Sequence, residues 1–336
     1  MPTPSENTRV DYETRRAVDL SQKYFRRTQH SEGYWWGELE SNPSMEAEYL
    51  MLCHFTGRYD KERWRKVSNF ILSKQRDNGS WGQYYGSLGD VSTSVECYFA
   101  LKLAGHPVDS EPMLKAKEFI LSKGGVPKVR VFTKIWLALF GQWDWKGTPN
   151  LPLEMIHLPS WAPFNIYEFA SWARATVVPM LIILAHKPRC PVPDSASIDE
   201  LYPGGRESTN YTLPKPSEGI GWGKVLYWAD KLVGIYQKFP VRPFRGYTER
   251  KIMNWILEHQ EADGSWAGIQ PPWVYSLIAL HTMGYGPDHE AVNRGFQGFE
   301  TFALEDEDTC AVQALSLIHI SEPTRRTPIS YAVFCL

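Results

Sequence analysis

The chain has 336 residues, 43% of them hydrophobic and 22% charged, which is enough for one large or two ordinary globular domains with a buried core. A net charge of −2 gives no sign of a nucleic-acid partner, and five scattered cysteines without a CxxC pair argue against a cysteine-based zinc site and favour a reducing compartment. The polar N-terminus lacks a secretory signal, and no run of about 18 apolar residues could span a bilayer.

One heptapeptide pattern, Q-x3-G-x-W, occurs three times. It is QHSEGYW at 29–35, QRDNGSW at 75–81 and QEADGSW at 260–266, and each copy follows an amphipathic stretch of helical period. The copies start 46 residues apart (29 to 75) and 185 apart (75 to 260), about four such intervals, which predicts repeated pairs of helices. The motif residues are Gln29, Gly33, Trp35, Gln75, Gly79, Trp81, Gln260, Gly264 and Trp266.

The chemistry of the motif predicts a clamp between helices. An Asp/Asn-Gly pair ends the preceding helix in a left-handed turn that glycine enters without strain. The glutamine amide can reach free backbone groups at the end of a neighbouring helix, and the indole can stack over that amide. We therefore expect the motif to stiffen a helical ring rather than to act in catalysis.

Apolar stretches between the motifs predict helices that are buried on most sides. They are SVECYFALKLAG at 94–105, VFTKIWLALFG at 131–141, ASWARATVVPMLIILA at 170–185 and WVYSLIALHTMG at 273–284. Strand signals are weak, and residues 187–221 are rich in proline, serine and glycine, as an exposed loop is. The predicted class is all-α, with apolar inner helices and amphipathic outer helices in an α/α barrel, or toroid.

Several polar residues interrupt the apolar helices. They are Glu46, Glu96, Arg130 and Gln270, with Trp136 and Tyr275 beside them. Burying two carboxylates with one arginine is costly unless all of them are hydrogen-bonded. The residues alone leave a structural ion-pair network and a functional polar site open.

The segment 222–238 predicts a helix with one apolar stripe. The stripe residues are Trp222, Val225, Leu226, Ala229, Val233 and Tyr236, spaced three and four apart and flanked by lysines. A helix of this kind either faces a core or lies in a membrane interface.

Four sequence blocks together resemble the bacterial squalene–hopene cyclases, a family of class II terpene cyclases. The blocks are GYWWGELESNPSMEAEYLMLCHFTG, RVFTKIWLALFG, NIYEFASWARATVV and GSWAGIQPPWVYSLIAL, and the resemblance runs over residues 11–314. It implies two α/α barrels of the terpenoid cyclase and prenyltransferase type around a nonpolar cavity, in which squalene is protonated and cyclised through cations to hopene. Such a cavity must exclude water, and aromatic rings stabilise cations without acting as bases, which suits the 14 tryptophans of the chain.

The resemblance also assigns expected roles to residues. Substrate binding falls to Phe132, Trp172, Ile269 and Pro271. A further set is expected to hold a water that takes the last proton, or that adds to the cation to give the alcohol. Its members are Glu46, Glu96, Arg130, Trp136, Gln270, Pro271 and Tyr275. Contact with the membrane falls to Trp222, Val225, Leu226 and Val233.

The same resemblance sets the expected surroundings of the protein. No cofactor and no metal is expected, and the partners are squalene and a membrane surface but not nucleic acid. A homodimer is one assembly open to the full-length protein. The expected location is the cytoplasmic side of the bacterial cytoplasmic membrane, as a peripheral, monotopic protein.

The expected domain organisation follows from the family. Residues 1–35 form an N-terminal segment and helix that packs on a second barrel, 36–300 form one barrel, and 301–314 begin the catalytic barrel. Residues 315–336 resemble a translated sequencing adapter and are expected to be non-native. EDEDT at 305–309 is interpreted as a solvated acidic loop rather than the DxDD acid of the family; DxDD is absent from the chain, so we expect the chain alone to be inactive.

Three other interpretations remain open. A prenyltransferase β-subunit shares the toroid but needs an Asp–Cys–His zinc triad, for which no convincing candidate exists. A class II diterpene cyclase is close in mechanism, but the GIQPPW and SWARA blocks point away from it. A non-enzymatic helical toroid that serves as an interaction module is the third.

Overall fold

The computed structural model describes residues 6–29, 31, 33, 35, 42–162, 165–213, 222–237 and 244–313. The chain divides into two units, one of Met1–Leu39 with Ser316–Leu336 and one of Glu40–Leu315. The first unit contains helix α1 (Glu6–Thr28), whose side chains from Val10 onward are exposed. The suspected adapter-derived tail, 315–336, lies outside the described residues.

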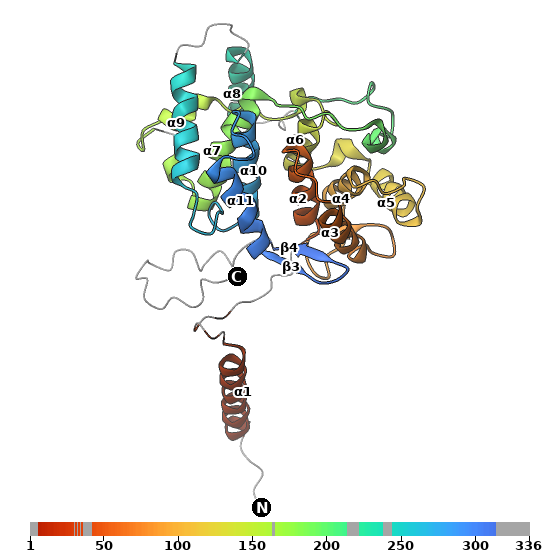
Figure 1. The fold of residues 1–336 in the computed structure, drawn as a ribbon, viewed down its shortest axis with the longest axis vertical. Helices are drawn as coiled ribbons and strands as arrows, with labels where there is room; N and C mark the ends of the chain where they lie inside the picture. Colours follow the sequence, from red (N-terminus) through yellow and green to blue (C-terminus); the bar gives the residue numbers. More distant parts are fainter. Residues whose placement is uncertain are drawn as a thin grey trace, which may run out of the picture. The chain divides into compact units, whose positions relative to one another are not determined.

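The second unit is built from helices of two kinds, as the sequence predicted. The inner helices are α2 (Ser44–Phe55), α4 (Val91–Leu103), α6 (Val131–Leu139), α7 (Ser171–His186) and α10 (Gln270–Thr282). In α4 every side chain from Ser92 to Lys102 is buried, so this helix has no solvent face. Helix α2 packs against α4 and against α10, and α10 runs beside α7, so the first and last inner helices are neighbours (Figure 1).

Amphipathic outer helices cover the inner ones. They are α3 (Lys61–Ser73), α5 (Glu111–Ser122), α9 (Arg245–Glu258) and α11 (Glu290–Thr301). Helix α3 packs on α2, α5 on α4, α9 on α7 and α11 on α10. Each buries one face and exposes the other, which is the arrangement of helix pairs in an α/α barrel.

The remaining elements are short, apart from helix α8 (Trp222–Tyr236). In the described part of the chain, 3-10 turns lie at Val126–Lys128, Trp145–Gly147, Leu153–His157, Ile166–Glu168, Asp194–Ala196 and Asp199–Leu201. Two antiparallel hairpins pair β1 (Trp81–Gly82) with β2 (Gly89–Asp90) and β3 (Ala303–Glu305) with β4 (Cys310–Val312). Within the described residues the strands amount to these two hairpins, and the all-α class is confirmed.

The motif at 75–81 joins two outer helices. The Gln75 Nε2 donates to the carbonyl of Gly79 at 3.0 Å and to the carbonyl of Pro112, in the first turn of α5, at 2.8 Å. The Trp81 Nε1 donates to the carbonyl of Ile71, in the last turn of α3, at 2.7 Å. The motif therefore closes the end of one outer helix and bonds it to the start of the next.

The motif at 260–266 repeats this geometry between α9 and α11. The Gln260 Nε2 donates to Gly264 at 3.0 Å and to the carbonyl of Ala291 at 2.8 Å, and the Trp266 Nε1 donates to the carbonyl of Ile256 at 2.7 Å. Both tryptophans are fully buried. The predicted clamp between helices is present, but the indole satisfies a helix-end carbonyl, a contact that the sequence interpretation had not assigned to it.

The glycine of the motif lies beyond the helix rather than at its end. Helix α3 ends at Ser73, and Gly79 has a φ of +79° in a separate turn that is closed by the Asn78 side chain, which accepts from the Ser80 backbone and hydroxyl. The predicted left-handed turn is therefore present, but the prediction that it ends the helix was wrong. The last turn of α3 has already closed with 3-10 bonds at Lys74.

Candidate functional site

The N-terminal ends of four inner helices lie together. Gln270, the first residue of α10, donates from Nε2 to the carbonyl of Met45 in α2 at 2.7 Å. The backbone N–H of Arg130, at the start of α6, donates to the Ser92 hydroxyl of α4 at 2.9 Å. Inner helices that begin at one end of the unit bring their first two turns, and any polar side chains in those turns, into a common place.

A buried polar group, defined here as Glu48, Glu96, Trp136 and Tyr275, occupies this place. Glu48 is 8% exposed, Glu96 3%, Trp136 0% and Tyr275 2%. The rings of Trp136 and Tyr275 are 5.9 Å apart between centroids, and the Thr133 hydroxyl donates to the Glu96 Oε1. Helices α2, α4, α6 and α10 each contribute one member of the group.

The pKa values of the two carboxyl groups in this cluster are raised. Burial raises the pKa of Glu96 to about 7, although the hydrogen bond from Thr133 opposes the shift. Burial, and then the charge of Glu96, raise the pKa of Glu48 well above its ordinary value. Burial, followed by the fields of both carboxylates, raises the pKa of the Tyr275 phenol. Two adjacent acids in a dry site cannot both ionise, so the pair retains a proton near pH 7.

Several buried polar atoms here make no hydrogen bond of normal geometry to any described residue. They are the Glu96 Oε2, the Trp136 Nε1 and the Gln270 Oε1. Buried polar atoms are almost always paired with protein or with ordered water, so donors and acceptors of this kind at one place fit a water site.

Glu48 was missed in the sequence, where Glu46 had been chosen. The Glu46 Oε1 accepts from the backbone N–H of Val312 in β4 at 2.9 Å, so this carboxyl is occupied by the β3–β4 hairpin. Residues two apart on a helix point about 200° away from each other, so only one of two acids in MEAEY could face Glu96. The spacing carried that signal, but it could not say which acid faces which neighbour.

Arg130 differs from the sequence expectation of a buried counter-ion. Its side chain is 48% exposed at the N-cap of α6, and its Nη2 lies 3.7 Å from the Asp90 Oδ1. Its charge still lowers the pKa of both Glu48 and Glu96. The expectation of burial was wrong because a residue at a helix N-cap can extend its long side chain into solvent.

The predicted substrate residues are distributed over three helix starts. Phe132, on the first turn of α6, is 48% exposed, and its ring centroid lies 6.5 Å from that of Tyr275. Ile269 is the N-cap of α10, and Pro271 follows in its first turn, both partly buried. Trp172, at the start of α7, is 54% exposed, and no ring contact joins it to Phe132 or Tyr275 within the described part of the chain.

Two surface pockets lie away from these residues. One is lined by residues of α8, α9 and the 3-10 turn at Leu153–His157, and the other by the loop that follows α7. Neither contains Phe132, Trp172 or Tyr275. No group of three or more His, Cys, Asp or Glu side chains that could hold a metal exists among the residues described.

Helix α8 exposes an apolar face that is rotated from the predicted one. Val225 is 53% exposed, Trp228 64%, Leu232 66% and Ile235 55%, at spacings of three, four and three. Two residues of the predicted stripe lie off this exposed face: Val233 is partly buried, and the Tyr236 hydroxyl donates to the Glu154 Oε1 at 2.8 Å. The side chains of Trp222 and Leu226 lie outside the described residues. No described helix has the length and apolar character needed to cross a membrane.

Comparison with known proteins identifies the family of the chain. The family model for the squalene–hopene cyclase N-terminal domain matches residues 18–308. The chain is 43% identical to the squalene–hopene cyclase of Alicyclobacillus acidocaldarius subsp. acidocaldarius over 290 residues, which cover 86% of this chain and 45% of that protein. It is 38% identical over 299 residues to the dammaradiene synthase of Dryopteris crassirhizoma, covering 89% of this chain and 43% of the synthase.

A third relative points the same way. The squalene–hopene cyclase of Zymomonas mobilis subsp. mobilis is 31% identical over 262 residues, or 78% of this chain and 39% of that protein. The chain thus spans less than half the length of these curated relatives. Through its N-terminal domain, the chain belongs to the squalene–hopene cyclase family of triterpene cyclases.

Proposed function

We propose that this chain is the N-terminal half of a squalene–hopene cyclase, an enzyme that protonates squalene and closes its rings through a series of cations to hopene or hopanol. One observation carries the proposal beyond family membership: a dry pair of carboxyl groups lies beside Tyr275 and the half-exposed Phe132, where four inner helices begin. This arrangement offers proton-accepting chemistry next to an aromatic wall.

The buried polar group would hold the water that ends the reaction. Glu48 and Glu96 share a proton near neutral pH, so one of them can take a proton through a bound water while the other stays neutral. Gln270 would orient that water with its unpartnered Oε1, and the carbonyl of Pro271 would assist. Transfer of the last proton to this water gives hopene, and addition of the water gives hopanol.

The aromatic residues would stabilise the cations. Phe132 and Trp172 expose their rings from the starts of α6 and α7, and a ring face contributes roughly 0.5–2 kcal/mol to a nearby cation. Ile269 and Pro271 would shape the wall between these rings. Rings stabilise a carbocation without capturing its proton, which a carboxylate in the same position would do.

The chain as written is proposed to have no turnover by itself. Its sequence contains no DxDD motif, which supplies the initiating acid in the family. We extend the proposal to the domain organisation: residues 1–35 pack on a second barrel, 36–300 form this barrel, 301–314 lead into the catalytic barrel, and 315–336 are non-native.

Cyclase assays of the recovered full-length gene product test this function. We expect hopene and hopanol from squalene by gas chromatography with mass spectrometry, and no product from the 336-residue chain. Glu48→Gln should change the hopene-to-hopanol ratio several-fold, whereas Glu111→Gln, an exposed acid on α5, should leave it unchanged. Product from the chain alone would contradict the proposed inactivity, and no product from the full-length enzyme would refute the proposed activity.

Membrane association is proposed from the exposed face of α8. Val225, Trp228, Leu232 and Ile235 would enter the lipid interface, so the enzyme would lie on the cytoplasmic face of the bacterial membrane as a monotopic protein, alone or as a homodimer. Trp228→Glu with Leu232→Glu should remove most binding in liposome co-sedimentation. Leu88→Glu, which alters an exposed apolar residue in the β1–β2 turn, should leave it intact, and equal binding of all variants would refute the proposed face.

A further inference from the structure

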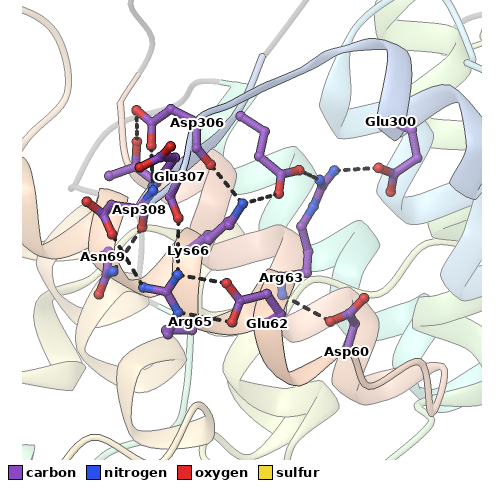
Figure 2. Close-up of polar contacts among 12 residues, drawn as sticks. Asp60, Glu62, Arg63, Arg65, Lys66, Asn69, Glu300, Asp306, Glu307 and Asp308 are labelled. Carbon is purple, nitrogen blue, oxygen red and sulfur yellow. Dashed lines mark hydrogen bonds and ion pairs between the residues drawn. The ribbon is translucent and has the colours of Figure 1, made fainter.

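The β3–β4 hairpin is fastened to helix α3 by charged side chains (Figure 2). The Lys66 Nζ lies 2.7 Å from the Glu305 Oε1 and donates to the carbonyl of Asp306 at 2.7 Å. Arg63 pairs with the same Glu305 carboxylate from the preceding turn of α3. One acid of the hairpin thus binds two cations of the helix, a more constrained arrangement than a single exposed pair.

Two more residues of α3 hold the acidic turn between the strands. The Asn69 Nδ2 donates to the carbonyl of Asp308 at 2.9 Å, and the Arg65 Nη2 donates to the carbonyl of Glu307 at 3.2 Å. The EDEDT run, which the sequence predicted to be a solvated loop, is exposed but bound along one helix. These contacts between α3 and residues 305–308 are called the charged strap below.

The other strand of the hairpin faces inward. In β4 the side chains of Cys310 and Val312 are buried, and the Val312 N–H donates to the Glu46 Oε1 at 2.9 Å. Glu46 is 1% exposed, and its second oxygen makes no hydrogen bond of normal geometry to any described residue. A buried carboxyl thus accepts a hydrogen bond from a strand that the charged strap secures on its outer side.

Glu46 lies between two contributors to the site. Met45, the preceding residue, accepts the hydrogen bond of Gln270, and Glu48, two residues on, belongs to the buried polar group. All three lie in the first turns of α2, a helix whose N-cap, Pro43, makes no side-chain capping bond. The bond from Val312 fixes the Glu46 side chain against the hairpin.

We propose that Glu46 is a positioning residue: by accepting the Val312 N–H it ties the strapped hairpin to the start of α2 and so fixes how Glu48 and the Met45 carbonyl face the buried polar group. The part of this proposal that concerns Glu48 rests on the proposed function, whereas the hydrogen bond between β4 and Glu46 does not. The role needs an acceptor oxygen within hydrogen-bond distance of the Val312 N–H, and it does not need a negative charge on that side chain.

The titration of Glu46 is shifted by its surroundings. Burial raises the pKa of Glu46 to about 8, against the opposing effects of the Val312 hydrogen bond and the Lys74 charge. The other ionisable groups nearby are the thiols of Cys97 and Cys310, and burial raises the pKa of Cys310 to about 12 and that of Cys97 well above its ordinary value. Glu48 and Glu96 also have raised pKa values, so a titration step near pH 8 at Val312 is assigned to Glu46 when Glu46→Gln removes it and Glu48→Gln retains it.

Amide exchange of Val312, followed by NMR of the 336-residue chain labelled with ¹⁵N-valine, is the first test. We expect Glu46→Leu to speed this exchange about tenfold, because the acceptor is lost, and Glu46→Gln to stay within about twofold of wild type, because its carbonyl oxygen remains. Glu48→Gln is the matched control on the same helix and should not change it. Unchanged exchange in Glu46→Leu, or equal acceleration in Glu46→Gln, would overturn the proposal.

The pH dependence gives a second readout, which tests whether the Val312 N–H meets the Glu46 carboxyl. The Val312 amide shift should titrate with a midpoint at about 8 in the wild type and lose that step in Glu46→Gln. The folded Glu46 carboxyl keeps its proton up to about pH 8 while the unfolded one releases it near 4.5, so this group lowers wild-type stability as the pH rises through that window. The glutamine variant lacks this share of the fall, and Glu48 and Glu96 still contribute theirs. A Val312 step that persists in Glu46→Gln would refute the assignment.

The strap and the site give the third readout. Glu305→Gln, an external change that should not affect folding, is expected to speed Val312 exchange two- to threefold, while Glu111→Gln on α5 should not. In the full-length cyclase, Glu46→Leu should lower kcat about tenfold with an unchanged KM, and Glu46→Gln should restore it. Absence of any wild-type cyclase activity would refute the proposed function and leave the exchange result standing; a normal kcat in Glu46→Leu would refute the positioning role itself.

Discussion

Within the described residues, the motif copies at 75–81 and 260–266 each bond their own preceding helix and a second helix, whereas the copy at 29–35 bonds its own preceding helix alone. In all three, the glutamine amide donates to the glycine carbonyl four residues on, at 3.0, 3.0 and 2.8 Å. In all three, the indole donates to the carbonyl ten residues back, at 2.7, 2.7 and 2.6 Å. The glutamine amides of the first two also bond an outer helix at 2.8 Å.

This difference separates what the heptapeptide does alone from what it does with a partner. The local bonds close the end of the preceding helix, so the heptapeptide and that helix are enough to form them. The second bond of the glutamine needs the first turn of another helix, and the described residues of the unit containing Gln29 include no second helix. We expect the N-terminal copy to make that bond with the second barrel of a full-length relative.

The largest effect should come from the glycines. A Cβ at Gly79 would overlap the backbone carbonyl group of Lys115, and one at Gly264 that of Arg294, while one at Gly33 would meet nothing within 4 Å. All three have positive φ, so alanine adds left-handed strain at each site. We expect Gly79→Ala and Gly264→Ala to lower the free energy of unfolding by about 2–5 kcal/mol.

Urea denaturation of the three alanine variants measures this. Gly33→Ala is the matched control, with a loss of about 1–2 kcal/mol confined to its own unit, since only the strain applies. A loss at Gly33→Ala as large as that at Gly79→Ala would show that backbone strain alone sets the cost. The proposed difference between the two docked copies, whose glutamines bond a second helix, and the copy at 29–35 would then be wrong.

The next effect should come from the glutamines. Gln75→Ala or Gln260→Ala removes two hydrogen bonds from partly buried positions and should cost about 2 kcal/mol, whereas Gln29→Ala removes one exposed bond and should cost about 0.5 kcal/mol. Gln75→Glu, equal in size, should be worse than alanine because a carboxylate would face two carbonyl oxygens. Equal losses for the three alanine variants would break the comparison.

The clamp could be predicted from the sequence because its parts are local and repeated. Three copies of the Q-x3-G-x-W pattern, each after an amphipathic stretch, indicated helix pairs with joined ends, and the apolar runs indicated the inner helices. The partner carbonyls of Pro112 and Ala291 could not be predicted, since they depend on how outer helices align after packing. The hydrogen bonds within each motif could thus be inferred from the sequence, whereas the alignment of neighbouring helices could not.

The site was predictable to the level of helix starts but not of single rotations. Glu96, Trp136 and Tyr275 were identified and do lie together. Glu46 and Glu48 were indistinguishable in the sequence, because a rotation of α2 by 200° exchanges their surroundings. That rotation is set by contacts with β4 and α10, far away in the chain.

A smaller effect is expected from the indoles. Trp81→Phe and Trp266→Phe keep most of the buried ring but remove the N–H that satisfies a helix-end carbonyl, which should cost about 1–2 kcal/mol. Trp35→Phe should cost less, since Trp35 is only partly buried and water can replace its N–H. Thermal unfolding of the three variants checks this, and a larger loss at Trp35 than at Trp81 would reverse the proposed order.

The smallest effect concerns the residue before the motif glycine, which is Asn78 in one copy and Asp263 in the other. The Asn78 Oδ1 accepts from the Ser80 N–H at 3.1 Å, and the Asp263 Oδ1 accepts from the Ser265 N–H at 2.9 Å. Both turns therefore use a side-chain oxygen and not a charge, so Asn78→Asp and Asp263→Asn should each change the free energy of unfolding by less than about 0.5 kcal/mol.

Alanine at either position is the informative contrast, because it removes the acceptor for both the backbone and the hydroxyl of the following serine. Asn78→Ala and Asp263→Ala should each cost about 1 kcal/mol in urea denaturation. If Asp263→Asn were as costly as Asp263→Ala, the carboxylate charge would matter at that turn. The two docked copies would then differ in mechanism, despite hydrogen-bond lengths that agree within 0.2 Å.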